Sequence, residues 1–192
     1  MQDPLLILTG YLLGSVSAAI LVSRLLGVPD PRQQGSGNPG ATNVLRLAGK
    51  KAAALTLAGD LLKGVIPVVL AKALGASLET QLLVALAAFL GHLYPIFFGF
   101  KGGKGVATAL GVLLALDWRI GLLCLAVWVA VFAWRRISSL AALSSAAVTP
   151  LLIFLITQSI PFLMFGVALG ALIFWRHRTN IERLIRGDEQ RS

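Results

Sequence analysis

Three short polar segments of this 192-residue chain carry the residue types that bind anions. The first is the run GSGNPGATNVLR at 35–46, where glycines such as Gly37 let backbone N–H groups approach a ligand closely. Arg46 adds a guanidinium, whose fork of donors suits a phosphate. The alternative is a polar loop with ordinary Asn-Pro-Gly turn chemistry. The neutral side-chain donors of this segment are Ser36, Asn38, Thr42 and Asn43.

The second segment is the run GFKGGKG at 99–105, which leads directly into an apolar stretch. If that stretch is helical, the backbone donors of Gly102, Gly103 and Gly105 and the helix N-terminus form a cradle for an oxyanion beside Lys104. The run lacks the Walker pattern, because Lys104 is followed by glycine and not by Ser or Thr, so nucleotide hydrolysis is not implied. The alternative is a flexible hairpin with two topology-setting lysines.

The third segment, 175–186, is basic and ends the last apolar stretch. On a helix His177 and Asn180 lie near one face, so both are expected to point at one ligand. A basic amphipathic tail on anionic lipid is the alternative. The three asparagines of the chain, Asn38, Asn43 and Asn180, all fall in the first and third segments, which favours a shared function for these segments.

Other polar residues lie in or beside apolar stretches. Asp60 and Lys63 are three residues apart and are expected to pair as structural support, since ionisable groups at that depth face a protein interior. His92 is expected to be a hydrogen-bonded interior histidine. Ser138 and Ser139 are candidates for lining the same cytoplasmic vestibule, or for capping a helix.

Several classes of site are excluded. Two histidines and one cysteine, Cys124, offer no metal-ligand spacing, and no cofactor or metal is expected. The G-x-S-x-G elbow of serine hydrolases is absent. The net charge of +9 does not indicate nucleic acid, because the basic residues sit in short connections between apolar runs.

The elements that position these residues are membrane helices. Hydrophobic residues make up 57% of the chain and charged residues 13%, and a helix of about 20 apolar residues crosses a bilayer. We therefore predict an all-α integral membrane protein with about seven transmembrane helices in a single domain, 1–192. The fourth span is the weakest. The predicted spans are 4–23, 53–71, 80–98, 105–117, 119–134, 137–157 and 160–175, and the motif loops are 24–52, 99–105 and 176–192. The pairs Gly10/Gly14 and Gly166/Gly170 predict close helix approach.

Charge orients these spans. With seven crossings and the N-terminus outside, fourteen of the 17 positive residues lie inside, Lys72 and Arg119 lie outside and Lys63 lies within a span. The C-terminus and all three motif segments are then cytoplasmic.

The three segments resemble a known family. The runs at 35–43, at 91–95 with 101–107, and at 177–184 are similar to the three motifs of the bacterial acyl-phosphate-dependent glycerol-3-phosphate acyltransferases (PlsY), in the same order and over the whole length. The resemblance implies transfer of a fatty acyl group from acyl phosphate to the 1-hydroxyl of glycerol 3-phosphate, giving lysophosphatidic acid and phosphate. It also implies an inner-membrane location with the active site on the cytoplasmic face, and coupling to an enzyme that forms acyl phosphate.

The resemblance assigns roles to residues. Ser36 and Arg46 of the first motif, and His177 and Asn180 of the third, are implied to be needed for activity. The glycine loop with Lys104 is implied to hold the glycerol phosphate, and Glu182 to maintain structural integrity. His177 is the expected general base, unless a substrate phosphate takes the proton. Ser36 is expected to donate to phosphate or carbonyl and not to act as a covalent nucleophile.

Two other functions remain open from the residues alone. One is a transporter or channel for phosphorylated metabolites. The other is a CDP-alcohol phosphotransferase, which normally needs a run of metal-binding aspartates, whereas the five aspartates here are widely scattered.

Overall fold

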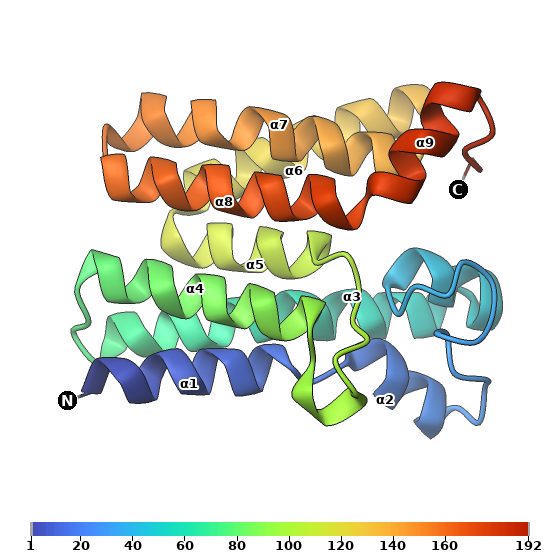
Figure 1. The fold of residues 1–192 in the computed structure, drawn as a ribbon, viewed down its shortest axis with the longest axis horizontal. Coiled ribbons are helices and arrows are strands. Elements are labelled where there is room, and N and C mark those ends of the chain that lie inside the picture. Colours follow the sequence, from blue (N-terminus) through green and yellow to red (C-terminus); the bar gives the residue numbers. More distant parts are fainter. Residues whose placement is uncertain (1, 192) are drawn as a thin grey trace. The chain divides into compact units, whose positions relative to one another are not determined.

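The computed structural model describes residues 2–191, which form helices and connections without a strand (Figure 1). They divide into two compact units, of which unit 1 ends at Leu116 and unit 2 begins at Asp117. The elements of unit 1 are α1 (Gln2–Gly14), α2 (Ala18–Leu25), α3 (Ala41–Ala73), α4 (Leu78–Leu93), the short 3-10 helix η1 (Ile96–Phe98) and α5 (Val106–Leu116). The elements of unit 2 are α6 (Trp118–Arg135), α7 (Ser138–Thr157), α8 (Ile160–Arg176) and α9 (Arg178–Arg186).

Only some of these helices are long enough to span a membrane. Four helices, α3, α4 with its extension to Phe98, α6 and α7, are long and apolar enough to cross a bilayer, and two bent pairs raise the number to six. The eleven residues of α5 extend about 16 Å, which is short of a hydrocarbon core of about 30 Å. An all-helical membrane protein is therefore confirmed, while seven crossings, a single domain and the orientation stay predictions.

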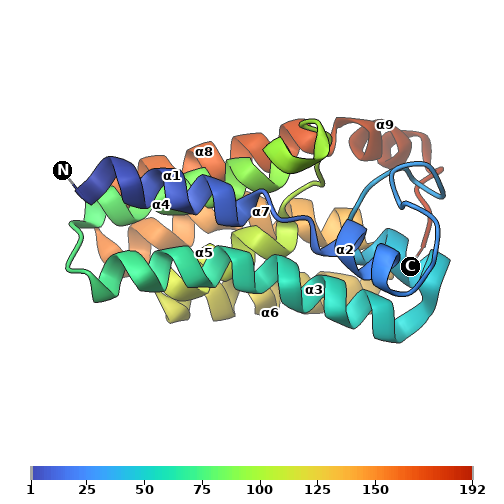
Figure 2. The same cartoon turned by 90° about the horizontal axis from the view of Figure 1, so that it is seen from below.

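Unit 1 places its long helices side by side. In Figures 1 and 2, α2, the connection before α3 and the glycine loop before α5 lie at the same end of this unit. The predicted close approach is present, because a Cβ on Gly10 would lie 2.8 Å from the carbonyl oxygen of Val84, and one on Gly14 would clash with the backbone of Ala88. Small residues on α1 thus bring its backbone against α4.

The first predicted span is not one straight helix. It breaks after Gly14 and resumes at Ala18 at an angle of 42°. The break leaves the carbonyl of Val16 outside the helical ladder, and the Lys63 ammonium donates to it at 2.8 Å. A buried lysine thus satisfies a backbone acceptor that a straight helix would have used itself.

The first predicted motif loop, 24–52, is shorter than expected. Residues 41–52 belong to α3, and a break at Gly49 (φ 78°, ψ −175°) separates this initial part from the rest of the helix. The initial part is held by Val44, which buries against Ala19 of α2, and Ala52 of the part after Gly49 joins the same cluster. The prediction of a loop was wrong here. The polar residues of this part lie on the same short helix as one stripe of packed apolar residues, and their number gave the segment the composition of a loop.

The end of the third predicted span also differs. α4 ends at Leu93 instead of residue 98, since Tyr94 and Pro95 leave the helical conformation before the turn η1. The Tyr11 hydroxyl donates to the Tyr94 carbonyl at 2.8 Å and holds this turn against α1.

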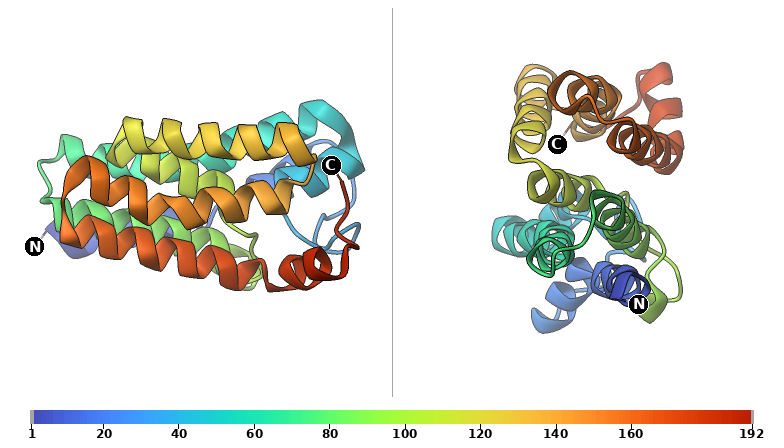
Figure 3. Two further views of the ribbon diagram at one scale, coloured as in Figure 1. Left: turned by 90° about the horizontal axis from the view of Figure 1, so that it is seen from above. Right: turned by 90° about the vertical axis from the view of Figure 1, so that its left-hand side faces the viewer.

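Unit 2 is a bundle of α6, α7 and α8, with α9 bent off the end of α8 by 62° (Figure 3). The three bundle helices agree with the predicted spans to within one or two residues at each boundary. Within the predicted third motif segment, 176–192, residues 178–186 are helical, as expected from the predicted shared face of His177 and Asn180.

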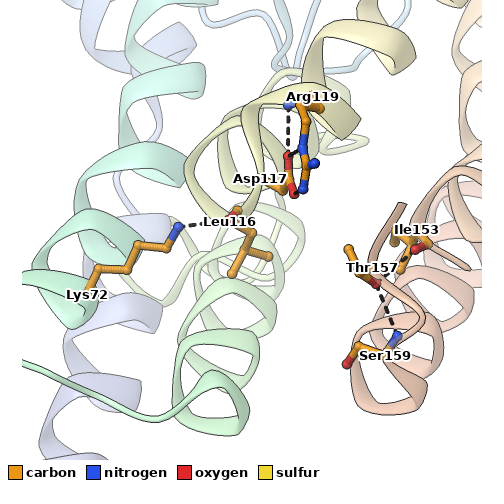
Figure 4. A network of polar contacts seen from close by, with 7 residues as sticks. All are labelled: Lys72, Leu116, Asp117, Arg119, Ile153, Thr157 and Ser159. Carbon is orange, nitrogen blue, oxygen red and sulfur yellow. Dashed lines mark hydrogen bonds and ion pairs between the residues drawn. The ribbon is translucent and has the colours of Figure 1, made fainter. Parts of the chain in front are cut away.

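Short polar contacts finish several helices (Figure 4). The Lys72 ammonium donates to the Leu116 carbonyl at 2.8 Å and so caps the C-terminus of α5. Asp117 caps α6 and accepts from the Arg119 guanidinium at 2.6 Å, and this hydrogen bond keeps the pKa of Asp117 below its usual range. The backbone N–H of Ser159 donates to the Thr157 hydroxyl in the turn between α7 and α8.

Candidate functional site

In unit 1 the first motif is organised by one amide side chain. Asn43 is 1% exposed, and its Nδ2 donates to the carbonyls of Pro31 at 2.9 Å and Gln34 at 3.0 Å. Its Oδ1 accepts from the backbone N–H of Ser36 at 3.0 Å. Both ends of the Asn43 amide are therefore engaged with the loop. Asn43 was predicted as a donor to substrate, and in the structure it holds the backbone of Ser36.

A second contact anchors this loop. The Arg32 guanidinium forms a bidentate pair with Asp30, with a shortest distance of 2.7 Å, and donates to the carbonyl of Phe98 at 2.9 Å. The hydrogen bond from Arg32 lowers the pKa of the Asp30 carboxyl. Arg32 is one of the fourteen positive residues predicted to lie inside. Its partner Phe98 lies 66 residues away, so no local pattern indicated the contact.

The other residues of the first motif differ in exposure. Ser36 and Arg46 are exposed, whereas Asn38 and Thr42 are half-buried. A Cβ on Gly40 would lie 2.7 Å from Nδ2 of Asn38, so the Asn38 amide covers the start of α3. Arg46 lies in the part of α3 before Gly49, and its guanidinium makes no described contact within residues 2–191.

The second motif is a glycine loop that packs tightly on the end of α4. A Cβ on Gly102 would clash with the carbonyl oxygen of His92, and the N–H of Gly103 donates to that same oxygen at 3.3 Å. A Cβ on Gly103 would also lie 3.3 Å from the carbonyl oxygen of Pro39. The structure therefore brings the first and second motifs together in unit 1, with half-buried Lys104 directly before the N-terminus of α5.

A buried polar cluster lies next to this loop. The predicted pair is confirmed, with the Lys63 ammonium 2.8 Å from the Asp60 carboxylate, and both side chains are less than a tenth exposed. Nδ1 of His92 lies 3.6 Å from the same carboxylate oxygen. His92 is thus an interior histidine, as expected, and it contacts the loop as well.

In unit 2, His177 joins two helices instead of lying within one. It ends α8 and begins α9, and its backbone N–H donates to Ile173 and Phe174 while its carbonyl accepts from Asn180 at 2.8 Å. The ring is 2% exposed, and Nδ1 lies 2.8 Å from the Ile173 carbonyl oxygen. Because that oxygen can only accept, Nδ1 carries a proton and donates to it.

Asn180 belongs to a carboxylate-centred cluster. Oε1 of Glu189 accepts from Nδ2 of Asn180 at 2.5 Å and from the Ser139 hydroxyl at 2.7 Å, and Oε2 accepts from Nε of Arg183 at 2.7 Å. Burial opposes ionisation of Glu189, but the hydrogen bonds from Ser139, Arg183 and Asn180 outweigh it and bring the pKa of its carboxyl below the usual range. Ser139 and Asn180 are therefore held together through Glu189, whereas Ser138 begins α7.

Sequence reasoning missed Glu189. The chain reverses at Gly187 (φ 78°), where the N–H of Asp188 donates to the Arg183 carbonyl, and this turn returns Glu189 to α9. Glu182, which we had expected to support the structure, is exposed and has no described partner within residues 2–191. The glycine three residues after Leu184 was the available signal, since a C-terminal glycine cap turns the following residues back.

Residues 2–191 contain no group of three or more His, Cys, Asp or Glu side chains arranged to hold a metal ion.

Comparison with known proteins connects these features. Residues 4–187 match the family model described as glycerol-3-phosphate acyltransferase. A protein of that name from Thioalkalivibrio sulfidiphilus is 60% identical over 96% of this chain and 91% of its own length. Another from Methylococcus capsulatus is 54% identical over 97% of this chain and 94% of its own length.

Two crystal structures are similar over the whole chain. Both are of PlsY (YgiH), an integral membrane glycerol 3-phosphate acyltransferase, at 43% identity. The glycerol 3-phosphate form has a TM-score of 0.95 and is covered over 96% of its length. The lysophosphatidic acid form has a TM-score of 0.92 and is covered over 95%.

Proposed function

Because this chain belongs to the glycerol-3-phosphate acyltransferase family, we propose that it transfers a fatty acyl group from acyl phosphate to the 1-hydroxyl of glycerol 3-phosphate. The products are lysophosphatidic acid and inorganic phosphate. The two similar crystal structures are of a glycerol 3-phosphate form and a lysophosphatidic acid form, which correspond to the acceptor and the product of this reaction.

The observation that carries the proposal is the glycine loop of unit 1. Its backbone lies against Pro39 of the first motif and enters α5, so loop N–H groups and a helix N-terminus are available beside the Lys104 ammonium. These groups match the charge and geometry of a phosphate. Ser36, held by Asn43, and the exposed Arg46 add a hydroxyl and a guanidinium to the same unit.

Chemistry at the carbonyl needs little from the protein. The hydroxyl oxygen of glycerol 3-phosphate forms a bond to the acyl carbon, and the bond from that carbon to the phosphate oxygen breaks, with the electron pair leaving on phosphate. Orientation and neutralisation of phosphate charge supply most of the rate enhancement. In unit 2, His177 is the proposed general base for the hydroxyl proton, and its Nδ1 donates to the Ile173 carbonyl. Asn180, which donates to Glu189, is the second residue of unit 2 proposed to be needed for activity.

The cellular setting follows from the same proposal. The chain is a multi-pass protein of the cytoplasmic membrane with its motifs on the cytoplasmic side, and an enzyme that forms acyl phosphate supplies its donor. Exposed Trp134 and Trp175, each beneath an arginine guanidinium, are suited to the membrane interface.

One assay tests the proposed reaction. Purified protein is incubated with glycerol 3-phosphate and either acyl phosphate or acyl-CoA, and lysophosphatidic acid and free phosphate are measured. We expect equal amounts of both products with acyl phosphate and none with acyl-CoA. Product formation with acyl-CoA and not with acyl phosphate would show that acyl-CoA is the donor. Absence of product with either donor would overturn the acyltransferase function. Transport predicts unchanged glycerol 3-phosphate inside sealed vesicles.

The base is tested by His177→Gln. Loss of most of kcat, with the acidic limb of the pH–rate profile removed, is expected. A variant that keeps its maximal rate and pH profile but loses affinity for glycerol 3-phosphate would show that His177 is not the base.

A further inference from the structure

The buried cluster of unit 1 contains two charged groups that the proposed reaction does not use. Asp60 and Lys63 of α3 are 3% and 8% exposed, and they lie with His92 of α4 and Thr108 of α5. Burying an ion pair costs free energy that a packed apolar pair would not, so it is a weak device for stability alone. The contacts of the cluster point towards the glycine loop.

Thr108 determines where the ring proton of His92 lies. Its hydroxyl, fully buried, is 2.8 Å from the Asp60 carbonyl oxygen and 3.1 Å from Nδ1 of His92. The hydroxyl has one hydrogen and the carbonyl can only accept, so the hydroxyl donates this hydrogen to the backbone carbonyl of Asp60. Nδ1 must then donate to the Thr108 oxygen. The proton is thus kept on the side of the Asp60 carboxylate, and Nε2 is on the opposite side of the ring.

Nε2 of His92 is directed at the glycine loop. A Cβ added to Gly103 would clash with Nε2 and would lie 3.1 Å from Cε1. The backbone of His92 contacts the loop too, because its carbonyl accepts from the Gly103 N–H. Ring and backbone of one residue therefore support the two glycines before Lys104.

The cluster also spans every helix that carries this end of unit 1. Lys63 donates to the Val16 carbonyl at the break between α1 and α2, while Asp60, His92 and Thr108 join α3, α4 and α5. A fixed imidazole in such a frame holds its neighbour to within a fraction of an ångström, which is the precision that a phosphate site needs.

We propose that His92 is a positioning residue of the phosphate site, held in one orientation and tautomer by Thr108, Asp60 and Lys63 so that its ring sets the placement of the glycine loop. This inference rests on the proposed function, in which that loop binds the phosphate of glycerol 3-phosphate. His92 acts through the loop and transfers no proton.

The test removes the two hydrogen bonds of the Thr108 hydroxyl, to the Asp60 carbonyl and from Nδ1 of His92, and keeps the shape of the side chain. Thr108→Val should raise KM for glycerol 3-phosphate about tenfold and leave kcat and KM for acyl phosphate within about twofold, since a lost buried hydrogen bond corresponds to roughly that factor. Thr108→Ser should restore wild-type KM. Thr56→Val is the matched control. The Thr56 hydroxyl, in α3, is buried like that of Thr108 but has no hydrogen-bond partner within the described residues.

A double-mutant cycle tests the contact itself. Gly103→Ala should raise KM strongly in the wild-type background, because the new methyl meets a ring that cannot move. In the Thr108→Val background the ring can shift, so the same change should have a smaller effect. Additive effects would show that the ring does not limit the loop.

Direct binding separates this inference from the proposed reaction. The Kd for glycerol 3-phosphate, and for inorganic phosphate, is measured by calorimetry without an acyl donor. A wild-type protein that binds glycerol 3-phosphate but forms no lysophosphatidic acid would overturn the reaction and leave the role of His92 testable by Kd. An unchanged Kd in Thr108→Val, or a melting temperature lowered with KM unchanged, would overturn the role of His92.

Discussion

Asn43 and Arg46 are three residues apart near the start of α3, yet their side chains have opposite environments. Asn43 is buried and uses its amide to hold the loop that carries Ser36. Arg46 is exposed and makes no described contact within residues 2–191. Substitutions at these two residues should therefore separate stability from activity.

Arg46→Ala should lower kcat/KM for glycerol 3-phosphate about 10- to 100-fold, since one charge-assisted hydrogen bond to phosphate contributes about 1.5–3 kcal/mol. Its melting temperature should equal that of the wild type, because the folded protein loses no internal contact. Lys50→Ala, an exposed cation of the same helix, is the control and should keep full activity. A loss of stability in Arg46→Ala would contradict the exposure of this side chain.

Asn43→Ala should lower the free energy of unfolding by about 2–4 kcal/mol, because it leaves buried loop groups without their partner. Thermal unfolding in detergent measures the change. Asn38→Ala, at the half-buried amide over Gly40, should lower activity with little change in melting temperature. Equal stabilities of the two variants would refute the organising role of Asn43.

Glu189 should make stability pH-dependent. Its pKa in the folded protein lies below the ordinary value of 4.5, so the folded carboxylate is favoured. Its contribution is therefore complete above about pH 4.5 and is lost as the pH falls through the lowered pKa. The melting temperature of the wild type should fall more steeply below pH 4.5 than that of Glu189→Gln. Asp188→Asn, at the exposed neighbouring residue, should retain the wild-type slope.

At the scale of elements, helix breaks place the functional side chains. The break at Gly49 separates the part of α3 with Arg46 from the part with Asp60 and Lys63. The bend between α8 and α9 occurs at His177, which ends one helix and begins the next. In both units, therefore, a break in the helix separates an apolar segment from a polar motif.

Gly49→Ala should impair function through the backbone alone. The conformation at Gly49 is accessible almost only to glycine, so alanine costs about 1–3 kcal/mol or forces the helix straight. No atom lies within 4 Å of the added Cβ, so steric contact is not the cause. We expect a raised KM for glycerol 3-phosphate. Gly75→Ala, which has positive φ and open space at the turn before α4, should lose some stability but keep its KM.

At the scale of the whole molecule, the charge distribution predicts orientation. Cys124 is the single cysteine and is buried, so the wild-type protein provides a low background for thiol labelling. Lys72→Cys should react with an impermeant maleimide added outside intact cells, whereas Lys50→Cys and Arg186→Cys should react only after permeabilisation. Labelling of Arg186→Cys from outside would reverse the predicted topology.

The sequence by itself determined what depends on local order. Span positions followed from runs of apolar residues, and the Asp60–Lys63 pair followed from helical spacing. The phosphate chemistry proposed for the glycine loop rests on residue type. Most boundaries were correct to a few residues, except where Gly14, Gly49 and Tyr94 interrupt helices.

Only the tertiary structure decided which polar groups meet. The Arg32 guanidinium donates to the Phe98 carbonyl, His92 of α4 lies against Gly103, and Glu189 accepts from Asn180. Each contact depends on a reversal of the chain that brings together residues separated in the sequence. A local sequence pattern does not predict such contacts. The physical reason is that buried donors and acceptors are paired by packing geometry, whereas membrane insertion depends on the apolar length of each segment.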